Sequence, residues 1–289
     1  MSESAPLTSA KAMPALDPGQ VDEFERIELL AWRDLYAAAD HSSRMSCGLE
    51  VFEVAGAFAS IASRVDVLAF NRVLGLGLAQ PVTSDAVGEI IARYAAAGTP
   101  RFFVQLAPGE RVDETQRVLE DHGLAFYNSW VKLQRELPCR AISDVAGIRI
   151  ERVGQRHAAV FSNLVVGAFE WPAPVAPWVA ATVGRTGWWH YLAWRGDRPA
   201  GTAAMFTDGT AAWFGFAATL TEERRHGVQT ALLARRLADA GEERCRHAVV
   251  ETAKQTRQRE APSYRNVRRA GFTVAYGRPN FLGRPGGAA

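Results

Sequence analysis

Apolar and polar positions along the chain follow the same order of elements twice. Helical and strand periods predict helix, strand, helix and strand in the first half, at residues 84–98, 101–107, 113–123 and 127–137. They predict the same order in the second half, at residues 227–241, 247–253, 262–271 and 272–278. Every one of these helical patterns ends at a glycine, which is a common helix stop: Gly98, Gly123, Gly241 and Gly271. The repetition indicates a duplication with a boundary near residues 137–147.

Further elements precede the repeated set in the second half. Residues 148–153 have the pattern of a strand, and residues 156–170 have helical spacing. Apolar runs separated by the turn sequences GDRP and DG predict a three-strand meander at residues 189–195, 200–207 and 210–219. A meander followed by a helix and a strand is typical of a mixed β-sheet flanked by helices. We therefore expect an α/β fold with a disordered leader and two domains, at residues 1–20, 21–140 and 147–289.

Composition and charge narrow the class of protein. Of 289 residues, 48% are hydrophobic and 22% are charged, which is enough for a packed core. A net charge of +2 does not favour nucleic acid or a membrane surface as a partner, and no apolar run is long enough to suggest a membrane helix. The cysteines are far apart and lack metal-site spacing: Cys47, Cys139 and Cys245. We expect reduced thiols, no metal and a cytoplasmic protein, since the leader also lacks the pattern of a signal peptide.

Basic residues gather where the predicted helix at 227–241 begins. Arg224, Arg225 and His226 directly precede Gly227. A helix N-terminus has unpaired N–H groups and a partial positive charge, and a glycine lets an anion approach the backbone closely. The pattern predicts a pyrophosphate cradle, and the alternative is a plain basic helix start. A nucleotide P-loop and a dinucleotide fingerprint are excluded, because neither GxxxxGK[ST] nor GxGxxG occurs here.

From about Ile148 to Phe281 the chain resembles the GNAT superfamily of acyl-CoA-dependent N-acyltransferases. The superfamily motif Q/R-x-x-G-x-G/A aligns with residues 224–229, where Arg224 and Gly227 match and Gln229 departs from Gly or Ala. The sequence NVRRAGF is similar to the end of the family's last helix. The resemblance implies acetyl-CoA as acyl donor and a small amine as acceptor. It implies a cofactor contact for these residues: Ala218, Thr219, Leu220, Arg224, Arg225, His226, Gly227, Val228, Gln229, Thr230 and Asn266.

The resemblance also directs the search for catalytic residues. The family's usual tyrosine acid corresponds to Val267 here, so Tyr264, one turn earlier, is the candidate acid; its alternative role is packing. Asn266 is either a cofactor contact or part of a solvated face. Glu251 lies in an apolar strand and is the candidate base, unless it faces solvent or an arginine. A second candidate base is Glu170, and aromatic residues either wall a substrate pocket or pack in the core: Trp171, Trp178, Trp188, Trp189 and Trp213.

The first half lacks a comparable cradle. Its GLG sequence at residues 75–77 has no basic cluster beside it. We interpret this half as a degenerate GNAT-like domain that packs on the second half and shapes its cleft. The leading hypothesis is an N-acetyltransferase that is a monomer or a homodimer. The alternatives are a non-catalytic acyl-CoA-binding or regulatory module and a protein-interaction scaffold.

Overall fold

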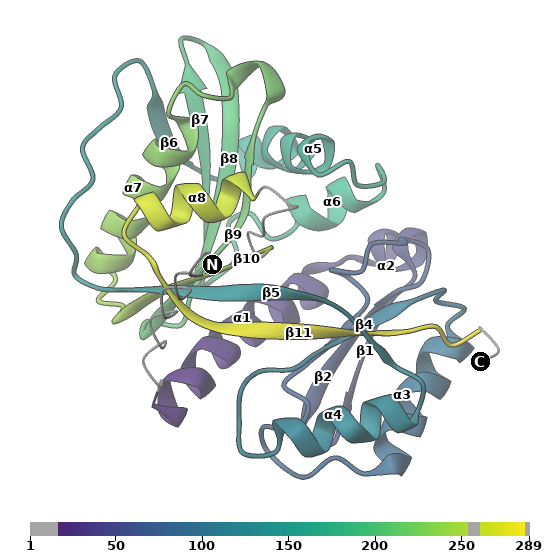
Figure 1. Ribbon diagram of the computed structural model, residues 1–289. Coiled ribbons are helices and arrows are strands. Elements are labelled where there is room, and N and C mark those ends of the chain that lie inside the picture. Colours follow the sequence, from purple (N-terminus) through teal and green to yellow (C-terminus); the bar gives the residue numbers. More distant parts are fainter. Residues whose placement is uncertain (1–16, 254–260, 287–289) are drawn as a thin grey trace, which may run out of the picture.

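The computed structural model describes residues 17–253 and 261–286. Within them, the strands form a single 11-stranded mixed sheet in the order β1-β2-β3-β4-β11-β5-β10-β9-β8-β7-β6, with helices on both faces (Figure 1). The strands of the N-terminal half are β1 (Leu49–Val54), β2 (Ala57–Ala62), β3 (Arg72–Leu74), β4 (Phe102–Gln105) and β5 (Ala125–Glu136). Those of the C-terminal half are β6 (Arg149–Val153), β7 (Trp188–Arg195), β8 (Arg198–Thr207), β9 (Ala211–Thr219), β10 (His247–Ala253) and β11 (Thr273–Gly283).

The helices follow the predicted duplication. The N-terminal half contains α1 (Pro18–Ala38), α2 (His41–Cys47), α3 (Ser84–Ala96) and α4 (Val112–Asp121). The C-terminal half contains α5 (Ala158–Ala168), α6 (Val175–Ala180), α7 (Val228–Glu242) and α8 (Pro262–Arg269). In each half a helix, a strand, a helix and a strand follow one another, as α3-β4-α4-β5 and as α7-β10-α8-β11. The repeated order that the sequence pattern predicts is therefore present in the structure.

Each half gives its last strand to the sheet of the other. Strand β5 pairs with β10 of the C-terminal half, with Leu133 opposite Val250. Strand β11 pairs with β4 of the N-terminal half, with Phe281 opposite Val104. The two exchanged strands also pair with each other and run side by side between the halves (Figure 1). Neither half therefore builds its part of the sheet from its own residues alone.

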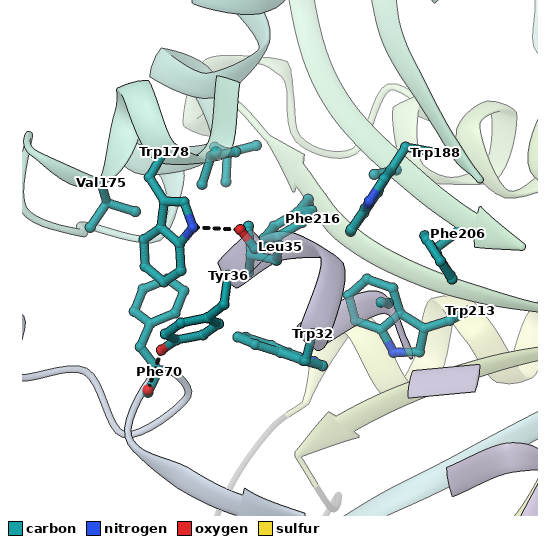
Figure 2. Packing of buried hydrophobic residues seen from close by; sticks show 14 of the residues in the cluster. Trp32, Leu35, Tyr36, Phe70, Val175, Trp178, Trp188, Phe206, Trp213 and Phe216 are labelled. Atoms are coloured by element: carbon teal, nitrogen blue, oxygen red, sulfur yellow. Dashed lines mark hydrogen bonds between the residues drawn. The ribbon is translucent and has the colours of Figure 1, made fainter. Parts of the chain in front are cut away.

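Helix α1 joins the two halves on one face of the sheet. Asp17 and Pro18 start it, and its buried stripe repeats at helical spacing: Phe24, Ile27, Ala31 and Leu35. Trp178 of α6 donates its indole N–H to the carbonyl of Leu35 at 2.7 Å (Figure 2). Trp188 of β7 donates to Asp34 at 2.8 Å. The core beneath α1 is thus shared by both halves, and the expected leader is corrected at its end, because residues 18–20 form the first turn of α1.

Each helix and strand that the sequence pattern predicts has a counterpart in the structure, with bounds that differ by a few residues. The meander is β7, β8 and β9, and the strand and helix before it are β6 and α5. Most of the expected leader, residues 1–16, lies outside the described residues. No helix of the described ranges is long and apolar enough to cross a membrane.

Candidate functional site

A bulge in β9 separates the two parallel strands at the centre of the C-terminal half. The β9–β10 pairing runs from Ala211 opposite His247 to Phe214 opposite Val250, and in the described part of the chain it ends there. The β8–β9 register shifts just beyond this point, where Phe216 has φ 48°. Both strands continue past the last pair, to Thr219 and Ala253. Beyond Phe214, the backbone of β9 on its β10 side therefore has no ladder partner among the residues that the structure describes.

Side chains from both faces hold this bulge in place. The hydroxyl of Thr202 donates to the carbonyl of Phe216 at 3.0 Å. The buried guanidinium of Arg236 on α7 donates to the carbonyl of Ala204 at 3.2 Å. Each bond satisfies a carbonyl close to the place where the bulge interrupts the ladder between β8 and β9. These hydrogen bonds therefore stabilise the bulge where β9 leaves its register with β8.

The N-terminus of α7 lies directly after the open end of β9. Gly227 is the N-cap residue with φ 83°, and no side chain caps the helix. The first N–H groups of an α-helix lack intrahelical partners, so those of Val228, Gln229 and Thr230 are available to an anion. A Cβ on Gly227 would meet Val145 Cγ1 at 2.6 Å. Both the left-handed backbone and this close approach require a glycine here.

Positive charge surrounds this helix start, as the sequence predicts. Arg224, Arg225 and His226 are all exposed. Arg195 of β7 donates to Glu223 at 2.7 Å, and the same guanidinium lies 3.4 Å from Nδ1 of His226. Glu223 therefore has a partner in Arg195 and His226 lies beside both, whereas Arg224 and Arg225 are exposed where an anionic ligand can reach them.

The remaining predicted cofactor contacts lie along the same path. Ala218 is buried and Thr219 is half-buried at the end of β9. The side-chain amide of Gln229 donates to the hydroxyl of Thr219 at 2.7 Å, which ties the helix start to the strand. The N–H of Leu220 donates to the carbonyl of Ala200 at 3.1 Å, so this residue offers its side chain and not its N–H to a ligand.

Helix α8 brings Tyr264 and Asn266 to the other side of β10. Tyr264 is half-buried and packs against the apolar cluster between α7 and the sheet. Val267, at the position of the family's usual tyrosine, is buried in that cluster. Asn266 accepts a hydrogen bond from Arg269 at 2.6 Å on the exposed side. The predicted acid thus lies on the first turns of α8, beyond the end of β10.

The candidate base, Glu251, is held among charged groups. It follows Val250, the last residue of β10 that pairs with β9, and its side chain is 7% exposed. Its Oε2 accepts from Arg278 at 2.9 Å, and Arg72 lies 3.8 Å from the same oxygen. Burial raises the pKa of Glu251 to about 7, and the neighbouring cations limit the rise. Glu251 therefore faces an arginine, as one alternative expected, and its role as a base, which a raised pKa would suit, stays a prediction.

Several of the aromatic residues pack in the core, and Trp188 and Trp189 also line a surface cavity with Arg152 and Arg185, so a pocket-lining role stays a prediction. Those buried in the core beneath α1 are Trp178, Trp188 and Trp213. Trp189 packs on the other side of β7, where the Arg152 guanidinium covers its ring. Trp171 is half-buried between Phe216 of the bulge and Phe70 of the N-terminal half. Glu170 is exposed at the end of α5, apart from the buried charges around Glu251.

The corresponding helix start in the N-terminal half has different chemistry. The hydroxyl of Thr83 caps α3 by accepting from the N–H of Ala86 at 3.2 Å. Asp85 places a carboxylate in the first turn of that helix. A capped N-terminus that carries a carboxylate repels an anion. This observation supports a single cradle, at α7.

Sequence reasoning missed the partners of Glu251. Lys132, Arg72 and Arg278 lie inside strands, and Glu28 lies on the buried side of α1. A charged residue in an apolar strand, such as Lys132 between Val131 and Leu133, is an available signal for a buried charge. The pattern could not say which charges meet, because they come from different strands and from α1.

Comparisons with known proteins agree with this geometry. No protein-family model and no curated protein matches the chain. A solved GCN5-related N-acetyltransferase from Kribbella flavida is similar, with TM-score 0.60, 19% identity and coverage of 89% of this chain and 96% of that one. A tandem GNAT protein from the clavulanic acid biosynthesis pathway has TM-score 0.59, 13% identity and coverage of 95% and 98%. A GCN5-related N-acetyltransferase from Sphaerobacter thermophilus has TM-score 0.57, 18% identity and coverage of 95% and 96%.

These likenesses extend over most of the chain. The similar structures and the sheet order place this chain among mixed α/β proteins in which two similar halves share one sheet. The chain has the GNAT fold, as the sequence motif predicts, and one of these similar structures is a tandem GNAT protein.

Proposed function

We propose that the protein is an acyl-CoA-dependent N-acyltransferase that moves an acetyl group from acetyl-CoA to a small primary amine at its C-terminal half. The observation that carries the proposal is the position of an uncapped, basic helix start directly after a strand that separates from its neighbour. The helix start suits a pyrophosphate, and the open backbone of β9 suits an extended amide-containing chain. Acetyl-CoA contains both a pyrophosphate and an extended amide chain. It can therefore contact the start of α7 and the end of β9 together, since only residues 220–227 separate these two elements.

The residues of this chain have separate tasks in the transfer. Glu251 takes a proton from the acceptor amine, directly or through a water, so that the nitrogen lone pair can attack the acetyl carbonyl carbon. The N–H groups of β9 beyond the bulge face the side from which the carbonyl oxygen is stabilised. As the new C–N bond forms, the C–S bond breaks and the sulfur receives a proton from Tyr264, which regains a proton from solvent as Glu251 releases the proton it took. The products are an amide and CoA, and no other reactant is needed.

A non-catalytic acyl-CoA-binding module is the second candidate. The buried Val267 at the position of the family's usual acid favours it, since a binding module needs no proton donor. This candidate keeps the cradle at Gly227 and gives Glu251 a structural role. The two candidates differ in turnover and not in cofactor binding.

A screen for CoA release separates them. The chain is incubated with acetyl-CoA and with amino acids, polyamines, aminoglycosides or peptides, and free thiol is followed with time. We expect one amine class to raise release above hydrolysis, and Glu251→Gln to abolish the increase. Binding of acetyl-CoA without release across the whole panel supports the binding module instead.

A further inference from the structure

Charged side chains form a closed cluster where α1 crosses the exchanged strands. Three cations and three carboxylates meet there, and all six side chains are buried: Glu25, Glu28, Arg72, Lys132, Glu251 and Arg278. They come from α1, β3, β5, β10 and β11, so both halves of the chain contribute. Their formal charges balance when every member is ionised. A buried charge of either sign is costly without such partners.

Glu28 and Glu251 share the same two arginines. Arg72 donates to Glu28 at 2.9 Å and lies 3.8 Å from Glu251. Arg278 donates to Glu28 at 2.7 Å and to Glu251 at 2.9 Å through a single nitrogen. Lys132 also bonds Glu28. Three cations therefore contact Glu28. Only two of them contact Glu251, and Glu251 shares both with Glu28.

The free oxygen of Glu251 is the second observation. Both arginines approach Oε2, and Oε1 has no hydrogen-bond partner among the described residues. Arg72 is fixed in turn by Gln105, which bonds Asn280 at 2.7 Å. One oxygen of the carboxylate is thus clamped, whereas the other is buried and accepts no hydrogen bond from these residues.

We infer that Arg72 and Arg278 are positioning residues that clamp one oxygen of Glu251 and leave the other to accept the proton of the acceptor amine. The inference rests on the proposed function for the role of Glu251. Because Arg72 belongs to β3, the N-terminal half supplies part of the active site of the C-terminal half. The first half then does more than pack against the second.

The charges of the cluster predict how the pKa of Glu251 changes when one neighbour is removed. Burial raises the pKa of Glu251 to about 7, Arg278, Lys132 and Arg72 lower it, and Glu28 raises it. Burial acts on Glu28 as well, but the same three cations hold its pKa well below the ordinary value. The remaining groups on this face, Glu25 and Tyr276, bond each other at 2.6 Å. Loss of Arg72 must therefore raise the pKa of Glu251, and loss of the Glu28 charge must lower it.

Infrared titration of the full chain tests this without an acceptor. The carboxyl band of Glu251 is isolated as the difference between the parent and Glu251→Gln, and its midpoint is followed with pH. We expect Arg72→Gln to raise the midpoint by about one pH unit, a tenfold change in proton affinity. Glu28→Gln should lower it by a similar amount. The matched control is Arg101→Gln, which removes an exposed pair with Asp66 in the same half and should leave the midpoint unchanged.

Each variant decides the inference by itself. If Arg72→Gln does not fold, Glu28→Gln is read alone, and an unmoved midpoint in whichever variant folds overturns the clamp. Equal shifts in the Arg101→Gln control would also overturn it. The pH dependence of CoA release then tests the base role separately. A midpoint that moves while the acid limb of turnover stays fixed keeps the clamp and removes Glu251 from the chemistry.

Discussion

Gly227 offers the sharpest perturbation of the cofactor cradle, because one methyl group tests it. Gly227→Ala forces a residue with a Cβ into φ 83°, in the left-handed region, and brings that Cβ to 2.6 Å from Val145 Cγ1. Val145 lies in the segment that connects the halves, just before β6. Either the helix start or this segment must move.

The magnitude follows from these two terms. A left-handed conformation costs an ordinary residue about 1–2 kcal/mol relative to glycine. Forcing an extra methyl group into a packed contact costs about 1–3 kcal/mol. We expect Gly227→Ala to lower the free energy of unfolding by at least ~2 kcal/mol when the terms combine. Displacement of the N–H groups of Val228 to Thr230 should weaken CoA binding by about tenfold.

A matched control lies in the same helix. A Cβ on Gly241 meets nothing within 4 Å, and its φ is not in the left-handed region. Gly241→Ala should therefore stabilise the chain by about 0.5–1 kcal/mol and leave CoA affinity unchanged. Urea unfolding gives the stabilities, and calorimetric titration with CoA gives the affinities. In a double-mutant cycle, Val145→Ala should recover the contact term of Gly227→Ala but not the backbone term.

If Gly227→Ala matches Gly241→Ala in stability, neither the backbone term nor the Val145 contact exists in solution. If Gly227→Ala destabilises the chain but binds CoA with parental affinity, the helix start does not hold the pyrophosphate.

Tyr264→Phe should lower turnover by about 10²-fold and leave acetyl-CoA binding unchanged, and a parental kcat would make this tyrosine a packing residue. Residues 147–289 alone should not fold, because β10 loses its β5 partner; co-expression with residues 1–146 should restore a folded complex, and an active lone fragment would contradict this. Burial lowers the pKa of His190 to about 3, so an unfolded chain binds a proton that the folded chain excludes. The His190 contribution to stability should fall below about pH 6.5 by up to ~1.4 kcal/mol per unit, seen in urea titrations as the difference between the parent and His190→Gln, because the raised pKa of Glu251 acts in the opposite direction in both.

The sequence allowed a prediction of the elements but not of how the strands are exchanged. Local periods place β5 and β11, because alternation depends on neighbouring residues only. The partner of a strand depends on distant segments, so the pattern could not show that β5 pairs with β10 and β11 with β4. The expected boundary near residues 137–147 separates the two repeats in the sequence. It does not separate two sheets, because one sheet runs through both halves.

The candidate site was predictable to a similar extent. Gly227 and its basic neighbours stand in one continuous motif, so residue types alone indicated an anion site at a helix start. Glu251 was found because apolar residues flank it, and its raised pKa agrees with that reasoning. Its partners Arg72 and Arg278 are far away in sequence. Arginine in a strand is more often exposed, so its type gave no reason to place it beside Glu251.

Calorimetric titration of the parent and of Gly227→Glu with CoA tests the central claim most directly. The proposed cradle occurs once in each chain, at the start of α7, and a glutamate there adds a side chain and a negative charge beside the pyrophosphate. We predict one CoA per parent chain and binding at least about tenfold weaker in Gly227→Glu, which is roughly 1.4 kcal/mol. Two CoA molecules per chain, or equal affinity in the folded variant and the parent, would contradict the account.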